Sequence, residues 1–272
     1  YDRVGGVKVR NYRGEWMELF RYISPFGVEC EADLDVTDYT SVLQGIVEFE
    51  LFFETWSGDG YNPTLTFAMT KGTPEYKYIN VEEIWYGTFS FGDYANQQPV
   101  PTVNYSFDSN VEKASVKVTT TGHNWSSGQN GTYNTGNAAE FLEATHHLFV
   151  DNNKEFDQHN WENCNPNPFG CQPQNGTWTY PRSGWCPGSI AMVWDFDISS
   201  HISKGSVNLF YQFDPNYIDE CHPNYPDCVD GQNGCPLCNA PDNPILKLAG
   251  KVITYSNDIE VLSDVNEQVT PE

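Results

Sequence analysis

Hydrophobic and polar residues alternate along most of this chain, with the two-residue period of a β-strand. The clearest case is GIVEFELFFETW, residues 45–56. One face of this predicted strand is hydrophobic and belongs in a core, while the other carries carboxylates and faces solvent. The hydrophobic face comprises Val47, Phe49, Leu51 and Phe53, and the opposite face comprises Glu48, Glu50, Phe52, Glu54 and Trp56.

The same alternation predicts further strands, which turn-forming residues separate from one another. They are VGGVKVRNY (4–12), TLTFAM (64–69), ASVKVTT (114–120), GSVNLFYQF (205–213) and KVITYS (251–256). The one helical candidate is NAAEFLEATHH, residues 137–147, whose last part can equally begin a strand, THHLFV. Many short strands with Gly, Pro and Asn between them predict an all-β sandwich or jelly roll.

A domain boundary is predicted in KGTPEYKY, residues 71–78, because Gly72 and Pro74 interrupt the strand pattern there. It divides the chain into residues 1–72 and 73–272. The first part is short for a β-sandwich, which usually has about a hundred residues.

Composition narrows the classes of partner. Lys and Arg number 14 against 37 Asp and Glu, so the 272-residue chain carries a net charge of −23, which repels nucleic acid and anionic membranes. Aromatic residues make up 15% of the chain, which is typical of a folded protein rather than an acidic disordered tail. We find no apolar run long enough to span a membrane.

The eight cysteines indicate an exported protein, secreted or periplasmic, with disulfides. Cys164 is expected to pair with Cys186, next to a turn framed by Pro and Gly. A second group lies in an insertion near residues 214–244, where two disulfides are favoured and a four-thiolate zinc site is the alternative. That group is Cys221, Cys228, Cys235 and Cys238.

Three short segments combine carboxylates with aromatic residues: YDRVGGV, FFETWSG and GNAAEFLEATHH. Glu54 and Trp56 leave the same face of one strand, an arrangement that suits a carbohydrate or an amide and also fits an exposed Glu beside a rim Trp. Arg182 and Trp185 lie in the turn PRSGWCPG, either as a polar and stacking surface for sugar or as packed structural residues.

These residues also occur in a familiar order. The succession YDR, GEWMELFRYISPFGVE, LDVTDYTSVLQG, FFETW, KGTPEYKY, GH, AAEF followed by TH, and PRSGWCPG resembles the bacterial peptide:N-glycosidase F family, from residue 1 to about residue 256. The resemblance implies two side-by-side antiparallel, eight-stranded jelly rolls with the active site in the cleft between them. It also implies metal-independent hydrolysis of the amide that joins an N-linked glycan to asparagine, with no cofactor.

Carried over by motif, the resemblance makes Asp2 the principal catalytic carboxylate, supported by Glu54 and Glu140. It assigns substrate binding to five further residues. They are Trp56, Arg3, His123, Arg182 and Trp185.

This chain departs from the family pattern in the region of Glu140. Ala138 and Leu142 stand where the family has a pair of cysteines, Phe141 replaces a Trp, and Thr121 stands where an aromatic residue is expected. The loop between His123 and Glu140 is also longer. We expect these changes to affect glycan selectivity more than the chemistry.

The family also has a segment before the position of Asp2. The first jelly roll is therefore expected to lack its first strands here. A missing N-terminal segment, either retained as a separate polypeptide or cut away, is expected to complete it. Cys30 is expected to pair either within that segment or with Cys171.

Two other functions fit parts of the sequence. A copper monooxygenase of similar architecture has a His-His pair, as in His146-His147, but this chain has no H-x-H motif to complete such a site. A non-catalytic glycan-binding jelly roll also fits, although it gives no reason for three carboxylates at the motif positions.

Overall fold

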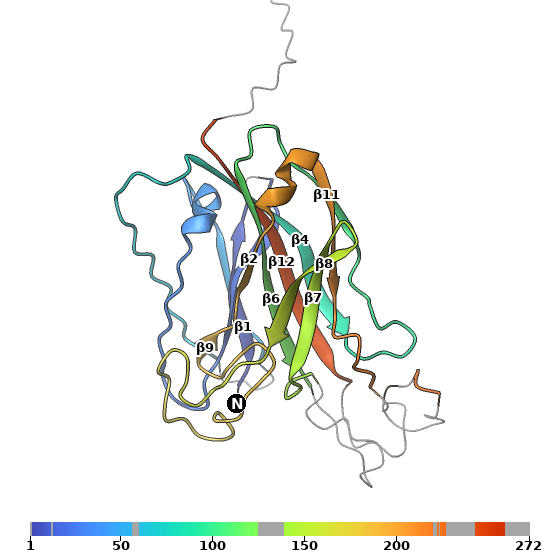
Figure 1. The fold of residues 1–272 in the computed structure, drawn as a ribbon. Helices are drawn as coiled ribbons and strands as arrows, with labels where there is room; N and C mark the ends of the chain where they lie inside the picture. Colours follow the sequence, from blue (N-terminus) through green and yellow to red (C-terminus); the bar gives the residue numbers. More distant parts are fainter. Residues whose placement is uncertain are drawn as a thin grey trace, which may run out of the picture.

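A computed structural model describes residues 2–11, 13–55, 60–124, 139–219, 222, 224–226 and 243–258. These residues form three four-stranded antiparallel sheets, which we name A, B and C (Figure 1). Sheet A has the order β3 (Phe49–Phe53), β1 (Val4–Arg10), β2 (Trp16–Ile23), β9 (Ser189–Ile190). Sheet B has the order β10 (Trp194–Asp197), β6 (Lys113–His123), β12 (Ile245–Ser256), β4 (Tyr78–Ser90). Sheet C has the order β5 (Val103–Ser106), β11 (Ser206–Gln212), β7 (Ala144–Val150), β8 (Asn153–Asn160).

Sheets B and C pack face to face as an eight-stranded sandwich. Their inward residues alternate along the strands and form one core, with Val116 and Leu248 from sheet B against Leu148 and Leu209 from sheet C. All four side chains are fully buried. Burial of this apolar surface is the main source of stability for the sandwich.

Sheet A lies on the other face of sheet B, so the middle sheet is covered on both sides (Figure 1). Val252 of β12 belongs to the core between B and C, whereas its neighbour Ile253 packs with Val7 and Val9 of β1. The 3₁₀ helix η1 (Thr37–Val42) closes this second core with Tyr39 and Val42. A second short 3₁₀ helix, η2 (Ser199–Lys204), precedes β11.

Charged residues occupy the part of the A–B interface nearest the middle of the strands. Arg21 of β2 donates to both carboxylate oxygens of Glu18, at 3.0 Å each, and the two side chains are 3% exposed. Burial raises the pKa of Glu83 on β4 to about 7, against the opposing charge of Lys251 on β12. The Glu18 N–H donates to Glu83 Oε2 (3.2 Å), and Arg21 donates to Thr121 Oγ1 and to the Lys247 carbonyl (2.7 Å each), and these contacts across the interface fix how sheet A sits on sheet B.

The two predicted units are joined at one end of the molecule. The short strand β9 pairs with the end of β2, through Tyr22 with Ile190 and Ile23 with Ser189. A disulfide joins Cys30, after β2, to Cys171. The boundary predicted at 71–78 ends where β4 begins, at Tyr78, but β4 and β12 serve both cores.

Of the two alternatives for NAAEFLEATHH, the strand at its end is confirmed, because β7 begins at Ala144 and places alternate residues in the core, and no described residue of the segment is helical. Two other local predictions were wrong. TLTFAM lies outside any strand, although Leu65 and Phe67 still pack on the core of sheet A. Leu51, predicted to be buried, is 38% exposed.

No helix in the described residues is long and apolar enough to cross a membrane.

Candidate active site

The end of sheet A places two of the predicted carboxylates near each other. The Arg3 N–H donates to Ser24 Oγ (2.8 Å), and the Glu54 N–H donates to the Val4 carbonyl (2.8 Å), so the pairing of β1 with both neighbours continues to the ends of the strands. Gly5 permits this approach, because a Cβ there would lie 2.3 Å from the ring of Phe53. Asp2 and Glu54 therefore lie just beyond the ends of two neighbouring strands, at the interface between sheets A and B.

Arg182 links Asp2 to Glu140. Its Nε donates to Glu140 Oε1 at 3.2 Å, and its Nη2 lies 3.8 Å from Asp2 Oδ2. The guanidinium is fully buried, and its remaining donors reach the carbonyls of Thr177 (3.1 Å) and Tyr180 (2.7 Å). A buried cation requires such partners, so Arg182 holds both carboxylates at one point.

The turn that carries Arg182 is held rigidly. Gly184 has φ 77°, and a Cβ at this position would lie 2.1 Å from the Thr120 carbonyl oxygen. The Ser183 N–H donates to the Glu140 carbonyl (2.9 Å), and Ser183 Oγ accepts from the Asn160 amide (2.9 Å). These contacts fix Arg182 relative to Glu140 before any substrate is bound.

Burial shifts the titration of both carboxyl groups. Desolvation raises the pKa of Asp2, opposed by the charge of Arg182. Desolvation, and then the charge of Asp2, raise the pKa of Glu140 to about 7, opposed by Arg182. A carboxyl group that titrates near neutral pH can give and take a proton under ordinary conditions.

Glu54 belongs to a second, adjoining cluster. Its Oε1 accepts a hydrogen bond from Lys247 of β12, and the pair is partly exposed, 41% for Glu54 and 20% for Lys247. Arg21 donates to the Lys247 carbonyl and to Thr121 Oγ1, both at 2.7 Å. Lys247 therefore links Glu54 to the charged interface between sheets A and B.

His123 lies between the two clusters. Its Nε2 is 2.8 Å from Thr121 Oγ1, and its ring stacks on Trp185 with centroids 5.5 Å apart. Desolvation, followed by the charges of Lys247 and Arg21, holds the pKa of His123 well below its usual value. The imidazole is therefore neutral at neutral pH and acts here as a packing and hydrogen-bonding group.

Trp185, which was expected to bind substrate, mainly supports the Arg182 side chain. It is 2% exposed, its Nε1 donates to the Gly122 carbonyl (2.7 Å), and the Arg182 guanidinium lies 4.9 Å from its ring centroid. Arg3 donates to the Asp2 carbonyl (3.1 Å) and so stays at the site. Trp56 lies outside the described residues.

Two residues at the site escaped the sequence analysis. Lys247 sits in an alternating strand pattern, but nothing in that pattern indicates that its partner is Glu54, far away in the sequence. Tyr61 stacks on Phe53 with centroids 4.7 Å apart, its hydroxyl oxygen accepts a hydrogen bond from Ser24 Oγ (3.2 Å), and its side chain is 40% exposed. An exposed aromatic beside Asp2 and Glu54 is a further surface on which a sugar ring can stack.

The His146-His147 pair does not form a shared site. His146 points into the core among Phe91, Tyr211 and Phe213, and its Nδ1 accepts from the Asp214 N–H (3.0 Å). His147 faces the other side of β7, where Nδ1 lies 2.7 Å from Asp157 Oδ1. Consecutive strand residues point to opposite faces, so the two imidazoles cannot ligate one ion together.

Two disulfide predictions are confirmed. Cys164 pairs with Cys186, beside Trp185, and Cys30 pairs with Cys171, one of its two expected partners. The four cysteines between residues 221 and 238 lie outside the described residues, as does most of the predicted insertion.

Comparisons with known proteins place this geometry in context. The family described as peptide-N-glycosidase F, C terminal, matches residues 90–226, just over half of the chain. A curated relative from Elizabethkingia miricola, peptide-N(4)-(N-acetyl-beta-D-glucosaminyl)asparagine amidase F, is 32% identical over 228 residues, which cover 78% of this chain and 62% of the relative. The chain thus spans less than two thirds of that relative's length.

Solved structures share the fold. One is described as PNGase F, a glycosylasparaginase from Flavobacterium meningosepticum, with a TM-score of 0.74 at 24% identity, over 95% of this chain and 79% of that one. Another, peptide-N(4)-(N-acetyl-beta-D-glucosaminyl)asparagine amidase, has a TM-score of 0.71 at 23% identity, over 95% and 80%. These matches confirm the predicted all-β class with the antiparallel jelly-roll fold.

Proposed function

Because the chain belongs to the peptide-N-glycosidase F family, we propose that it is an amidase that releases N-linked glycans from asparagine in glycoproteins or glycopeptides. The observation that carries the proposal is the buried Arg182 between Asp2 and Glu140. The similar protein named an asparagine amidase supports the substrate class.

Hydrolysis of this amide requires an activated water and a proton for the departing nitrogen. Water adds to the carbonyl carbon of the asparagine side chain, the C–N bond breaks, and the nitrogen leaves with the glycan as a glycosylamine after it gains a proton. The peptide keeps an aspartate. In our proposal Asp2 transfers the proton at the scissile amide, and the shared Arg182 balances its charge.

Glu140 sets the protonation of Asp2. Each carboxylate disfavours ionisation of the other, and the negative charge of Asp2 already raises the pKa of Glu140. One proton shared by the pair therefore stays available near neutral pH, where a lone surface carboxylate has none.

Glu54, anchored by Lys247, is proposed to orient the attacking water or the first sugar. Trp56, Arg3 and His123 are proposed to contact the glycan or the asparagine. Arg182 is proposed to hold the two carboxylates in place. Trp185 packs against the Arg182 guanidinium and supports it rather than stacking on a sugar.

We further propose that the protein works in an oxidising compartment, as a secreted or periplasmic enzyme. The two disulfides support this, because such bonds persist outside the reducing cytosol.

The test is incubation of the chain with a denatured N-glycoprotein, followed by mass analysis of the peptide and the glycan. Release of the glycan with conversion of asparagine to aspartate is expected, and Asp2→Asn should lower the release rate by at least about 10²-fold. Retention of the glycoprotein without release would instead identify a glycan-binding module. Release at an unchanged rate by Asp2→Asn would refute the role of Asp2.

A further inference from the structure

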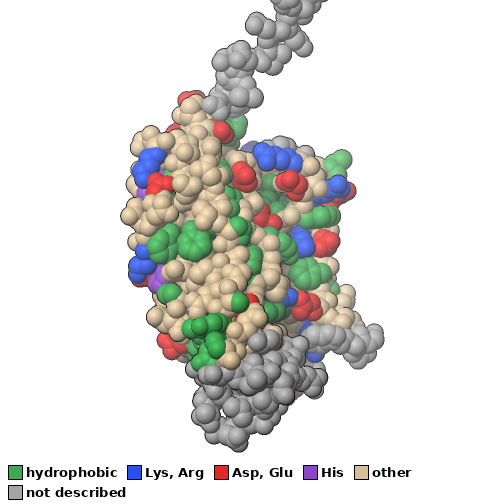
Figure 2. Space-filling model, turned by 90° about the vertical axis from the view of Figure 1, so that its right-hand side faces the viewer, with side chains coloured by type: hydrophobic (Ala, Val, Ile, Leu, Met, Phe, Trp, Pro, Cys, Tyr) green, Lys and Arg blue, Asp and Glu red, His purple; other side chains and the backbone are tan. Residues whose placement is uncertain are grey.

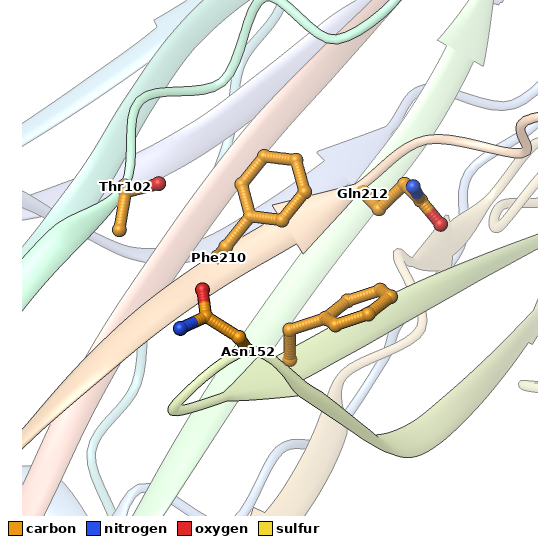
Figure 3. A pocket seen from close by; sticks show the side chains of 5 residues that line it. Thr102, Asn152, Phe210 and Gln212 are labelled. Carbon is orange, nitrogen blue, oxygen red and sulfur yellow. The ribbon is translucent and has the colours of Figure 1, made fainter.

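A cavity lies far from Asp2, on the outer face of sheet C. It has a volume of about 280 Å³, and Figure 3 shows its lining side chains. Four of the five belong to β11, β7 and the β7–β8 turn, and the fifth precedes β5. They are Phe210, Gln212, Phe149, Asn152 and Thr102.

Topology separates this cavity from the proposed active site. Glu140 lies just before the start of β7, whereas Phe149 lies near its end, about 17 Å of strand beyond Ala144 at 3.3 Å per residue. The cavity also opens on the face of sheet C that points away from sheets A and B. The two sites therefore cannot share a lining residue.

The floor of the cavity is aromatic. Phe210 and Phe149 are directly opposite each other in the β11–β7 ladder, with ring centroids 5.9 Å apart and planes inclined at 49°. Both are only partly buried. Figure 2 presents the side of the molecule that lies on the right in Figure 1, and it shows hydrophobic side chains at this surface, with Lys or Arg and His side chains beside them at the left edge.

The remaining lining residues are neutral and polar. Thr102, Asn152 and Gln212 supply a hydroxyl and two amides, which both donate and accept hydrogen bonds. Among the described residues, no hydrogen bond engages any of these three side chains, so their polar atoms are available to a ligand. Asn152 has φ 67°, in a tight turn that holds its amide at the rim.

We propose that this cavity is a second saccharide-binding site, which takes a neutral sugar residue. The two phenyl rings offer surfaces for the C–H face of a pyranose, and the amides and hydroxyl match its hydroxyl groups. The lining has no charged group, and the net charge of −23 disfavours an anionic ligand. A volume near the lower end of ligand pockets suits a terminal sugar rather than a whole oligosaccharide.

The choice of a saccharide over another neutral polar ligand rests on the proposed function. A glycoprotein commonly carries more than one glycan, and a glycan held on sheet C keeps the others at a high effective concentration near Asp2. The site therefore increases the rate of release from substrates with several glycans and leaves the hydrolysis of a single glycan unchanged.

The test measures binding rather than hydrolysis. The probe is a free neutral oligosaccharide of mannose, without the N-acetylglucosamine and asparagine that the proposed active site takes, titrated against the whole chain by calorimetry or by ligand-observed NMR. Phe210→Ala should weaken binding at least tenfold, and Gln212→Ala several-fold without removing an aromatic ring from the sheet. Phe169→Ala, at an aromatic residue 37% exposed elsewhere, should bind as the wild type does.

Release of glycan from a peptide with one glycan should be the same for Phe210→Ala as for the wild type, and release from a protein with several glycans should be slower. Wild-type affinity in both Phe210→Ala and Gln212→Ala, or no binding by the wild type, would overturn the proposal. Neither result affects the amidase proposal, which glycan release by the wild type tests separately.

Discussion

Arg182 is the residue on which the proposed active site depends. Its guanidinium is fully buried, and a buried cation is tolerated only when hydrogen bonds and opposite charges surround it. Two backbone carbonyls and the carboxylates of Asp2 and Glu140 meet this need. Burial at the same place raises the pKa of both carboxyl groups, to about 7 for Glu140.

Glu140→Gln tests this coupling, because activity and stability should change in opposite directions. The pKa of Glu140 is about 7 in the folded chain, against an ordinary value of 4.5. The contribution of Glu140 to the free energy of unfolding is therefore complete below pH 4.5 and is lost as the pH rises to about 7. The variant should therefore match the wild type near pH 4.5 and be more stable by about 1–3 kcal/mol at pH 8. Glycan release should fall by about 10²-fold.

Urea unfolding at the two pH values measures the first effect. The unfolding free energy of the wild type should differ between pH 4.5 and pH 8. If the variant shows the same difference as the wild type, Glu140 does not cause this pH dependence.

Lys247 is predicted to position Glu54. Lys247→Met keeps most of the side-chain volume and removes the cation, so Glu54 loses its partner across the interface. We expect kcat for glycan release to fall about tenfold with little change in KM, while Lys247→Arg retains most of the rate. Stability should change by about 1 kcal/mol or less, because the pair is partly exposed.

Lys8→Met is the matched control for Lys247→Met. Lys8 of β1 pairs with Glu50 of β3 within sheet A, with 3.5 Å between Nζ and Oε1, away from Asp2. It should release glycan at the wild-type rate. Equal rates for Lys247→Met and Lys8→Met would remove Lys247 from the site.

At the scale of elements, the turn after Tyr180 matters more than any strand. Strand residues supply the framework, but Arg182 and Ser183 lie in a turn outside the regular sheets. Gly184 makes the turn possible, through its positive φ and its close approach to Thr120 and Asn160. The disulfide Cys164–Cys186 holds the following residues in place.

Gly184→Ala should therefore disrupt the site as well as the fold. We expect a loss of about 2–4 kcal/mol in unfolding free energy and a much lower rate of glycan release, since a Cβ would lie 2.1 Å from a backbone oxygen. Gly170→Ala is the control: φ is 74°, and nothing lies within 4 Å of the added Cβ. It should lose only about 1–2 kcal/mol and keep its activity.

Thermal unfolding and release assays on both glycine variants distinguish backbone strain from steric contact. Similar losses in the two variants would mean that positive φ alone, and not the contact with Thr120, explains the need for glycine at 184.

The elements also show where sequence patterns are informative. The alternation of hydrophobic and polar residues predicted β1, β6, β11 and β12. In these strands, the residues before and after each core position are polar or face another sheet. The pattern at residues 64–69 is as regular, yet this segment finds no partner strand, and a strand requires one. The segment at 137–147 has helix-forming residues, but the core of the sandwich draws alternate side chains inward from Ala144 onward.

At the scale of the whole molecule, the site is made of parts that are distant in the sequence. The family resemblance predicts that Asp2, Glu54, Glu140 and Arg182 belong to one site, a prediction that the spacing of these residues along the chain does not supply. Lys247 was missed because its contact with Glu54 depends on how sheet A sits on sheet B. Packing between sheets has no signature within a single strand.

The disulfide Cys30–Cys171 should therefore be a main support of the site, since it ties the segment after β2 to the segment that precedes the Arg182 turn. It closes 141 residues of sequence, against 22 for Cys164–Cys186. In the chain-entropy model the longer loop stabilises by about 1.6 kcal/mol more than the shorter one. Further ties between sheet A and this region include the two register pairs of β9 and a small cluster around Trp185.

Replacement of Cys30 and Cys171 by serine should thus lower the unfolding free energy by about 2–5 kcal/mol and reduce glycan release further than the loss of folded protein explains, because Asp2 and Arg182 come from the two sides of this junction. Hydrogen exchange locates the effect: β1 and β2 should lose protection, while β7 and β11, inside the sandwich, should keep theirs. Equal loss of protection in both sheets would show that the chain unfolds as one unit and that the disulfide does not act at the junction alone.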